Sequence, residues 1–171
     1  MKLTLSKRQR AVLEVMDKPK IPVEIRNRIG LKKTNNLSAA VKKLVNTGLI
    51  CCLNPNASVG RLYGLTKKGV GLRKKLGFRD YCQPKNINWY LYGWVVCGKQ
   101  RKAILRAMMP DIPMSLRTIR ERALEHNPRI SRTNANDILQ LFIGKGIAMK
   151  IKQGNGAIFG LTKFGQRIRN S

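Results

Sequence analysis

The chain has 171 residues, and its 35 Lys and Arg against 8 Asp and Glu give a formal net charge of +27. Such an excess of one sign repels itself in a folded protein, and it is usually retained because a polyanion neutralises it. A membrane surface is excluded as that polyanion: no apolar run approaches the ~20 residues of a span, no basic amphipathic helix has a large aromatic face, and the first ten residues lack a signal-peptide core. Nucleic acid is therefore the expected partner, because a merely solvated surface would carry more interspersed acids.

Side chains that could perform chemistry are few and scattered. The cysteines Cys51, Cys52, Cys82 and Cys97 and the single His126 form no Cys-x-x-Cys or His-x-x-x-His spacing. We expect free thiols in a reducing cytosol, no metal site and no cofactor. With one histidine, few carboxylates and no glycine-rich phosphate loop, the chain is not expected to be an enzyme.

A repeated heptapeptide divides the chain. Residues 63–69 read YGLTKKG and residues 159–165 read FGLTKFG. In each, a Leu before a Thr indicates a strand that ends where a helix begins, because Thr can cap the free backbone donors of the first helical turn. Similarity at a fixed spacing indicates a module used twice. We expect domains at residues 1–77 and 94–171, joined by residues 78–93, each near the lower size limit for an independent core.

The first module begins with three predicted helices. Residues 6–16 separate an apolar side from a basic one, and Pro22 suits the first turn of a second helix that ends at Gly30. Thr34 or Asn35 caps a third helix that ends before Gly48. Its apolar residues recur at i, i+3, i+4, i+7 and i+8, which predicts one buried face. This stripe consists of Leu37, Ala40, Val41, Leu44 and Val45.

The outer face of this third helix carries small, amide-bearing and basic side chains. Such residues can approach base edges and phosphates, although a polar outer face is by itself more often only solvated. The basic charge of the module and the position of the helix favour contact with nucleic acid. The candidate contacts here are Lys33, Thr34, Asn35, Asn36, Ser38, Ala39, Lys42 and Lys43.

A β-hairpin follows the third helix. Residues 49–53 and 61–65 are strand-like, and residues 54–60 between them have turn composition. Arg61, near the tip, is placed to meet a phosphate or a minor groove, although a lone arginine on a hairpin is commonly only solvated. Thr66 then caps a last helix, on which we expect Arg73 to lie outside with the neighbouring lysines.

Residues 78–93 are too apolar for a flexible spacer. They include Phe78, Tyr81, Trp89 and Tyr90, and large aromatic side chains usually pack in small domains. We expect a turn around Pro84 and then a packed, ordered stretch that holds the two modules as a fixed pair. Stacking on the bases of single strands is the alternative role.

The second module repeats this order. Residues 98–109 match the first helix, and Pro113 is expected in the first turn of a helix that runs to about His126. A third helix and a hairpin at residues 148–161, with a Gly and Asn turn, come next, and Thr162 opens the last helix. The apolar stripe of this third helix consists of Ala135, Ile138, Leu139, Phe142 and Ile143.

The third helix of the second module has a different outer face from the third helix of the first module. Asp137 is interpreted as a cap partner near the helix start, where a carboxylate is favourable. An exposed Leu141 suggests contact with a protein partner or with a second copy. The candidate nucleic-acid contacts of this module are Arg129, Arg132, Thr133, Asn134, Asn136, Gln140, Lys150 and Lys152.

Three helices followed by GLICCLNPNASVGRLYGLTKKG, residues 48–69, resemble the winged helix-turn-helix transcription regulators common in archaea, which are related in build to the MarR and ArsR groups. Their pattern is a helix ending in Gly-Leu-hydrophobic, a Gly-Arg-hydrophobic-Tyr return strand, and then Leu-Thr-x-x-Gly. The match covers nearly all of residues 5–77. It recurs in the second module, where Ala157 and Ile158 replace the Gly-Arg pair and weaken the expectation of a wing-tip arginine contact.

The resemblance implies a mainly α fold with small β-hairpin wings, an α+β chain of two tandem winged helices. It also implies a cytoplasmic protein that binds double-stranded DNA, either as a transcription regulator or as an architectural protein of the nucleoid with limited sequence preference. The extreme charge favours the architectural role. Two alternatives stay open: a tandem winged-helix scaffold that binds proteins through Leu141 or the aromatic linker, and an RNA-binding protein.

Overall fold

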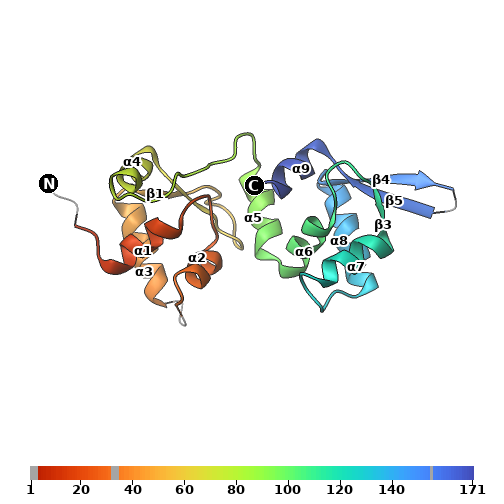
Figure 1. Cartoon of the computed structure of the whole chain (residues 1–171), viewed down its shortest axis with the longest axis horizontal. Helices are drawn as coiled ribbons and strands as arrows, with labels where there is room; N and C mark the ends of the chain where they lie inside the picture. Colours follow the sequence, from red (N-terminus) through yellow and green to blue (C-terminus); the bar gives the residue numbers. More distant parts are fainter. Residues whose placement is uncertain (1–3, 32–34, 155) are drawn as a thin grey trace. The chain divides into compact units, whose positions relative to one another are not determined.

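The computed structural model describes residues 4–31, 35–154 and 156–171, without the side chains of Asn35 and Asn36. Over this part of the chain the fold is α+β, with nine helices and small antiparallel sheets (Figure 1). Two compact units are formed. Unit 1 comprises Met1–Lys85 and Trp89–Gly93, and unit 2 comprises Asn86–Asn88 and Trp94–Ser171. None of the described helices is long and apolar enough to cross a membrane.

Unit 1 starts with three helices around one core. Ser6 caps the first of them through a capping box: its hydroxyl accepts the N–H of Gln9 at 3.3 Å, and the Gln9 side chain accepts the N–H of Ser6 at 2.9 Å. Four residues of the predicted stripe on the third helix are buried, but Val45 is 37 % exposed, so its assignment to the core was wrong. The helices are α1 (Lys7–Val15), α2 (Pro22–Arg28) and α3 (Asn35–Asn46).

A short hairpin follows α3. Strand β1 (Ile50–Cys52) pairs antiparallel with β2 (Tyr63–Leu65), and both strands are shorter than predicted. The long loop between them is held by the fully buried Asn54, whose Oδ1 accepts the N–H of Leu62 at 2.7 Å while its Nδ2 donates to the Gly60 carbonyl at 3.0 Å. A buried amide with its bonds satisfied therefore shapes this loop.

The repeated heptapeptide performs the same structural task in both units. Thr66 begins α4 (Lys67–Lys75), and its hydroxyl accepts the N–H of Gly69 at 3.1 Å. Thr162 likewise accepts the N–H of Gly165 at 3.0 Å. A Cβ at either glycine would overlap a backbone carbonyl oxygen of the segment that precedes the hairpin. The prediction that these threonines open a helix is confirmed, and the glycines are required by close backbone approach.

Arg73 in α4 is buried, so the prediction that it lies outside was wrong. Its Nη1 donates to the carbonyls of Leu13 and Glu14, the latter at 2.8 Å, and its Nε donates to the Arg79 carbonyl at 2.7 Å. At the end of α1 the Leu13 carbonyl also accepts the N–H of the C-cap residue Met16 at 3.3 Å, and the last carbonyls of a helix generally lack regular helical partners. The guanidinium supplies donors to them, which explains why a charged side chain is placed inside the unit.

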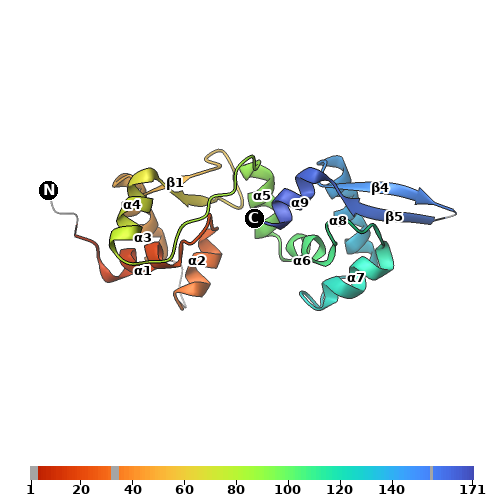
Figure 2. The same cartoon turned by 45° about the horizontal axis from the view of Figure 1, so that its top comes forward.

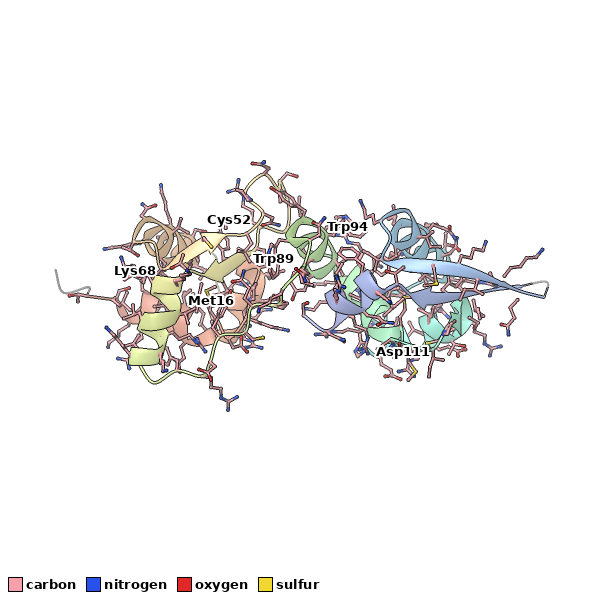
Figure 3. All side chains as sticks on the ribbon, turned by 90° about the horizontal axis from the view of Figure 1, so that it is seen from above. Met16, Cys52, Lys68, Trp89, Trp94 and Asp111 are labelled. Atoms are coloured by element: carbon pink, nitrogen blue, oxygen red, sulfur yellow. The ribbon has the colours of Figure 1, made fainter. Side chains whose placement is uncertain are left out.

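Most of the aromatic residues after α4 pack, as predicted, but Tyr90 is 44 % exposed, so the prediction was wrong for that residue. Phe78 and Tyr81 lie against the core of unit 1, and the Tyr81 hydroxyl accepts the N–H of Leu65 at 3.1 Å. Burial raises the pKa of Tyr81 to about 12. The stretch then continues as helix α5 (Trp89–Cys97), which carries Trp89 and Trp94 (Figure 3) and supplies residues to both units.

Helix α5 was not predicted from the sequence. Trp89 and Tyr92 meet edge to face at 5.9 Å within unit 1. In unit 2, Trp94 lies 6.1 Å from the Phe142 ring, and the Arg101 guanidinium stacks 4.3 Å above it. These contacts are of the kind that stabilise small cores.

Unit 2 repeats the order of unit 1 with one addition, the short strand β3, which pairs with β5 at Met114 and Phe159 to make a sheet of order β3-β5-β4. Pro113 therefore precedes a strand and not the first helical turn. The second helix starts after Ser115, whose hydroxyl accepts the N–H of Thr118 at 3.1 Å, and ends before His126. The elements are α6 (Lys99–Ala107), β3 (Met114–Ser115), α7 (Leu116–Leu124), α8 (Arg132–Gly144), β4 (Ala148–Gln153), β5 (Gly156–Leu161) and α9 (Lys163–Arg169).

Candidate nucleic-acid interface

The outer face of α3 is polar and open to solvent. Ser38, Ala39, Lys42 and Lys43 are all exposed, opposite the buried stripe of the same helix. Lys33 and Thr34 lie outside the described residues, and Asn35 and Asn36 are placed at the start of α3 without described side chains. The structure therefore presents four of the eight predicted residues of this group on one accessible surface.

Arg61 lies across a cavity from α3. The cavity has a volume of about 380 Å³ and is bordered by the outer side of α3 and by the hairpin, including Ser38, Lys42, Arg61 and Tyr63. The Arg61 side chain is exposed and donates from Nε to the Ala57 carbonyl at 3.4 Å. Helix and hairpin thus bring two cationic side chains and two hydroxyl-bearing side chains to the same concave surface.

The other residues that border this cavity were not predicted as part of a site, and Val45 and Cys52 are two of them. Val45 contributes an exposed methyl surface, and Cys52 of β1 borders the same cavity. The only sign in the sequence that Val45 is not buried was its position as the last residue of the predicted apolar stripe. Apolar contact of this kind suits a thymine methyl group.

Helix α8 offers a less basic surface. Arg132, Thr133, Asn134 and Gln140 are exposed, and Asn136 is partly buried. The helix is capped by Ser131, whose hydroxyl accepts the N–H of Asn134 at 3.0 Å.

Asp137 is not part of the cap of α8. It is exposed in the second turn of the helix, so the interpretation of Asp137 as a cap partner was wrong. The capping signal that the sequence did contain was Ser131, immediately before the first helical residue.

The structure separates Arg129 from the other predicted residues of unit 2. Its N–H donates to Asn127 Oδ1 at 3.1 Å, and its carbonyl accepts from Gln100 Nε2 at 3.2 Å, which ties the segment between α7 and α8 to α6. The Arg129 side chain lines a cavity together with Ile138 and Leu141. The same cavity is also lined by Lys99 and Arg101, so Arg129 lies among cationic and apolar side chains and not on the outer face of α8.

The β4–β5 ribbon projects from the helices of unit 2 (Figure 2). Lys150 and Lys152 are exposed on β4, as predicted. The residues between and beside them on the opposite face, Met149 and Ile151, are 43 % and 36 % exposed. The ribbon therefore combines cationic and apolar side chains. The two types alternate in the sequence, but only the lysines were predicted as contacts.

The cations of the candidate interface are not neutralised by acids. Among the described residues that were predicted as contacts, no lysine or arginine side chain is ion-paired. Asp17 lies elsewhere, with Lys20 and Arg28 as partners. Partial burial raises the pKa of Asp17, but the hydrogen bonds and charges of Lys20 and Arg28 outweigh burial and lower it to about 2.

Comparison of the chain with models of protein families, with curated proteins and with solved structures found no match. The exposure, charge and placement of the side chains are therefore the features from which a function can be inferred.

Proposed function

We propose that the protein binds double-stranded DNA through two winged helix-turn-helix modules, residues 1–77 and 94–171. The order of three helices, a hairpin and a last helix occurs in each unit and supports this interpretation. The observation that carries the proposal is the concave surface of unit 1, where Ser38 and Lys42 of α3 border the same cavity as Arg61 of the hairpin. In this arrangement α3 enters a major groove while the hairpin contacts the backbone.

In this proposal, unit 2 contributes mainly contacts with phosphates. Lys150 and Lys152 on the ribbon and Arg132 at the start of α8 contact phosphates, while α8 itself reads few bases because its outer face lacks the lysines of α3. A duplex held mostly by phosphate contacts is bound with limited sequence preference. The proposal is therefore an architectural protein of the nucleoid, with transcription regulation as the related role that selective binding to one sequence would indicate.

An electrophoretic titration of the full chain tests the proposal. Double-stranded DNA, duplex RNA and single strands are compared, each with and without random-sequence competitor. Double-stranded DNA is expected to bind most tightly. Random-sequence competitor DNA is expected to displace a bound duplex nearly as well as competitor that contains any chosen site. Tighter binding of RNA would contradict the proposal, and strong preference for one sequence would indicate a regulator.

Paired variants separate a site from mere charge. Lys42→Ala with Lys43→Ala removes two cations from α3, and we expect a loss of about tenfold in affinity, typical of lost phosphate contacts. Lys74→Ala with Lys75→Ala removes the same charge from exposed positions on α4 and should change affinity much less. Gln140→Ala in α8 should also have little effect. Equal losses from the two double variants would show that the α3 face is not a site.

A further inference from the structure

Unit 2 contains a cavity that the proposed DNA contacts do not use. It has a volume of about 590 Å³ and lies between the first turn of α6, the segment before α8 and the outer side of α8. Its apolar wall includes Pro128, Ile138 and Leu141, and Leu141 is 49 % exposed. An exposed leucine in a concave surface is a common feature of sites that accept an apolar side chain from a partner.

The rim of this cavity is cationic. Lys99 and Arg129 are exposed, and within the described part of the chain neither side chain has a carboxylate partner. Arg101 adds a third cation, which is held in place because its Nε donates to the Trp94 carbonyl at 2.9 Å. Among the described residues that line the cavity, none is acidic. The positive potential of the rim therefore favours a partner that carries carboxylates.

The walls are fixed without a partner. The hydrogen bond from Gln100 to the Arg129 carbonyl joins α6 to the segment before α8 at 3.2 Å. Gly98 is the N-cap residue of α6, and it provides no side-chain acceptor for the N–H groups of the first turn. A preformed surface of this kind loses little conformational entropy on binding.

The equivalent place in unit 1 has different chemistry. There a cavity of about 440 Å³ lies between the first turn of α1 and α3, and it is lined by Arg8, Ala39, Ala40 and Lys43. Lys43 occupies the position on α3 that Leu141 occupies on α8. Unit 1 thus presents a cation where unit 2 presents an apolar side chain, which suits a polyanion in the first case and an amphipathic segment in the second.

We propose that the unit 2 cavity binds an acidic, amphipathic segment of a partner protein. Apolar side chains of that segment would pack on Ile138 and Leu141 while its carboxylates meet Lys99 and Arg129. A nucleic acid is disfavoured as occupant, because the apolar wall with Ile138 and Leu141 offers no hydrogen-bond donor to its phosphates. A second copy is also disfavoured as occupant, because the chain has 8 acidic residues against 35 basic ones and repels itself. The role goes beyond DNA binding, since it would attach a second protein to the bound duplex.

The test uses the full chain and three fluorescein-labelled peptides of about 15 residues, long enough for a helix with repeated anchor positions. One peptide combines Leu and Glu in helical order, one replaces Leu by Ser, and one replaces Glu by Lys. Binding is followed by fluorescence anisotropy at about 150 mM salt, where surface charge is screened beyond ~8 Å. Random duplex DNA is present in saturating amount to occupy the basic surfaces. The Leu and Glu peptide is expected to bind, and the other two are not.

Variants locate the binding. Leu141→Lys places the unit 1 residue type in the cavity, and Arg129→Glu reverses a rim charge; each is expected to weaken the Leu and Glu peptide about tenfold or more, as for an interface anchor. The controls are Ile112→Lys, a similarly exposed apolar residue outside the cavity, and Lys163→Glu, a matched charge reversal on α9. These should bind normally, and NMR spectra verify that each variant is folded.

Several outcomes overturn the inference. They are equal binding of the Ser and Glu peptide, which would indicate charge alone; no binding of the Leu and Glu peptide; and an unchanged affinity of Leu141→Lys. A loss of duplex binding in the two cavity variants, as large as that in the α3 double variant, would assign the surface to DNA. Because the α3 variants report DNA binding separately, failure of the proposed function and failure of this inference are distinguishable.

Discussion

The buried guanidinium of Arg73 makes a sharp prediction about stability. Arg73→Met keeps most of the side-chain volume but removes the donors to the carbonyls of Leu13, Glu14 and Arg79. A buried polar group left without a partner costs about 1–3 kcal/mol, and a more accessible one costs about 0.5–1.5 kcal/mol. We therefore expect unit 1 to lose about 2 kcal/mol of its free energy of unfolding, because the Leu13 carbonyl keeps the Met16 N–H at 3.3 Å while the Glu14 and Arg79 carbonyls belong to exposed residues.

Arg169 is a matched control because it occupies the same position at the end of the last helix in unit 2. Its Nη2 donates to the Arg106 carbonyl at only 3.4 Å, and within the described residues its buried Nε has no partner. Arg169→Met should therefore cost about 1 kcal/mol or less, because one weak bond is lost and an unsatisfied donor is removed. Urea unfolding, with amide signals of each unit followed separately by NMR, measures both values. A similar cost at the two sites, or a negligible cost at Arg73, would refute the reasoning.

Three further predictions concern the ionisation of Tyr81, the ionisation of Asp17 and the coupling of the two units. The pKa of Tyr81 is raised from 10.0 to about 12, so its contribution to stability should be complete below pH 10.0 and should vanish as the pH rises through 12. In unfolding measured as a function of pH, Tyr81→Phe should abolish this loss of stability at alkaline pH. Asp17, lowered from 3.8 to about 2, should stabilise unit 1 fully above pH 3.8 and lose its contribution as the pH falls through 2; unfolding that shows the same acid dependence in Asp17→Asn would count against this. Because α5 supplies residues to both units, we predict that they tumble together and that Trp89→Ala uncouples them; separate correlation times by ¹⁵N relaxation in the unaltered protein would contradict a fixed pair.

Much of each unit follows from short-range patterns in the sequence. The i, i+3, i+4 stripes predicted the buried faces of α3 and α8, because a surface helix must bury one side. Thr66 and Thr162 marked the start of the last helices, because a hydroxyl at that position satisfies a free backbone donor. These signals are local, and the structure retains them.

The features that were missed depend on contacts between distant segments. Arg73 is buried because the end of α1, about sixty residues earlier in the chain, needs donors. Strand β3 has only two residues, and it exists because β5 offers it an edge. Helix α5 is apolar all round, so it showed no amphipathic period and could not be distinguished from other packed structure.

The candidate site was predictable to a similar extent. The exposure of Lys42 and Lys43 follows from the stripe opposite them, so the sequence alone located these residues on the outer face. The cavity that brings Arg61 beside α3 depends on how the hairpin folds back, and that fold rests on the buried Asn54. The apolar cavity of unit 2 likewise needed three segments to be placed in space before Arg129 and Leu141 could be seen together.

Salt dependence of duplex binding tests the central claim most directly. The affinity of the full chain for a random-sequence DNA duplex is measured at a series of salt concentrations. If the exposed cations of both modules meet the backbone, they should release counterions from roughly 6–10 phosphates, and affinity should fall by about 10³ to 10⁵ between about 50 and 200 mM salt. The Lys42→Ala, Lys43→Ala variant should show a slope smaller by about two contacts. An affinity that does not change with salt would contradict the account.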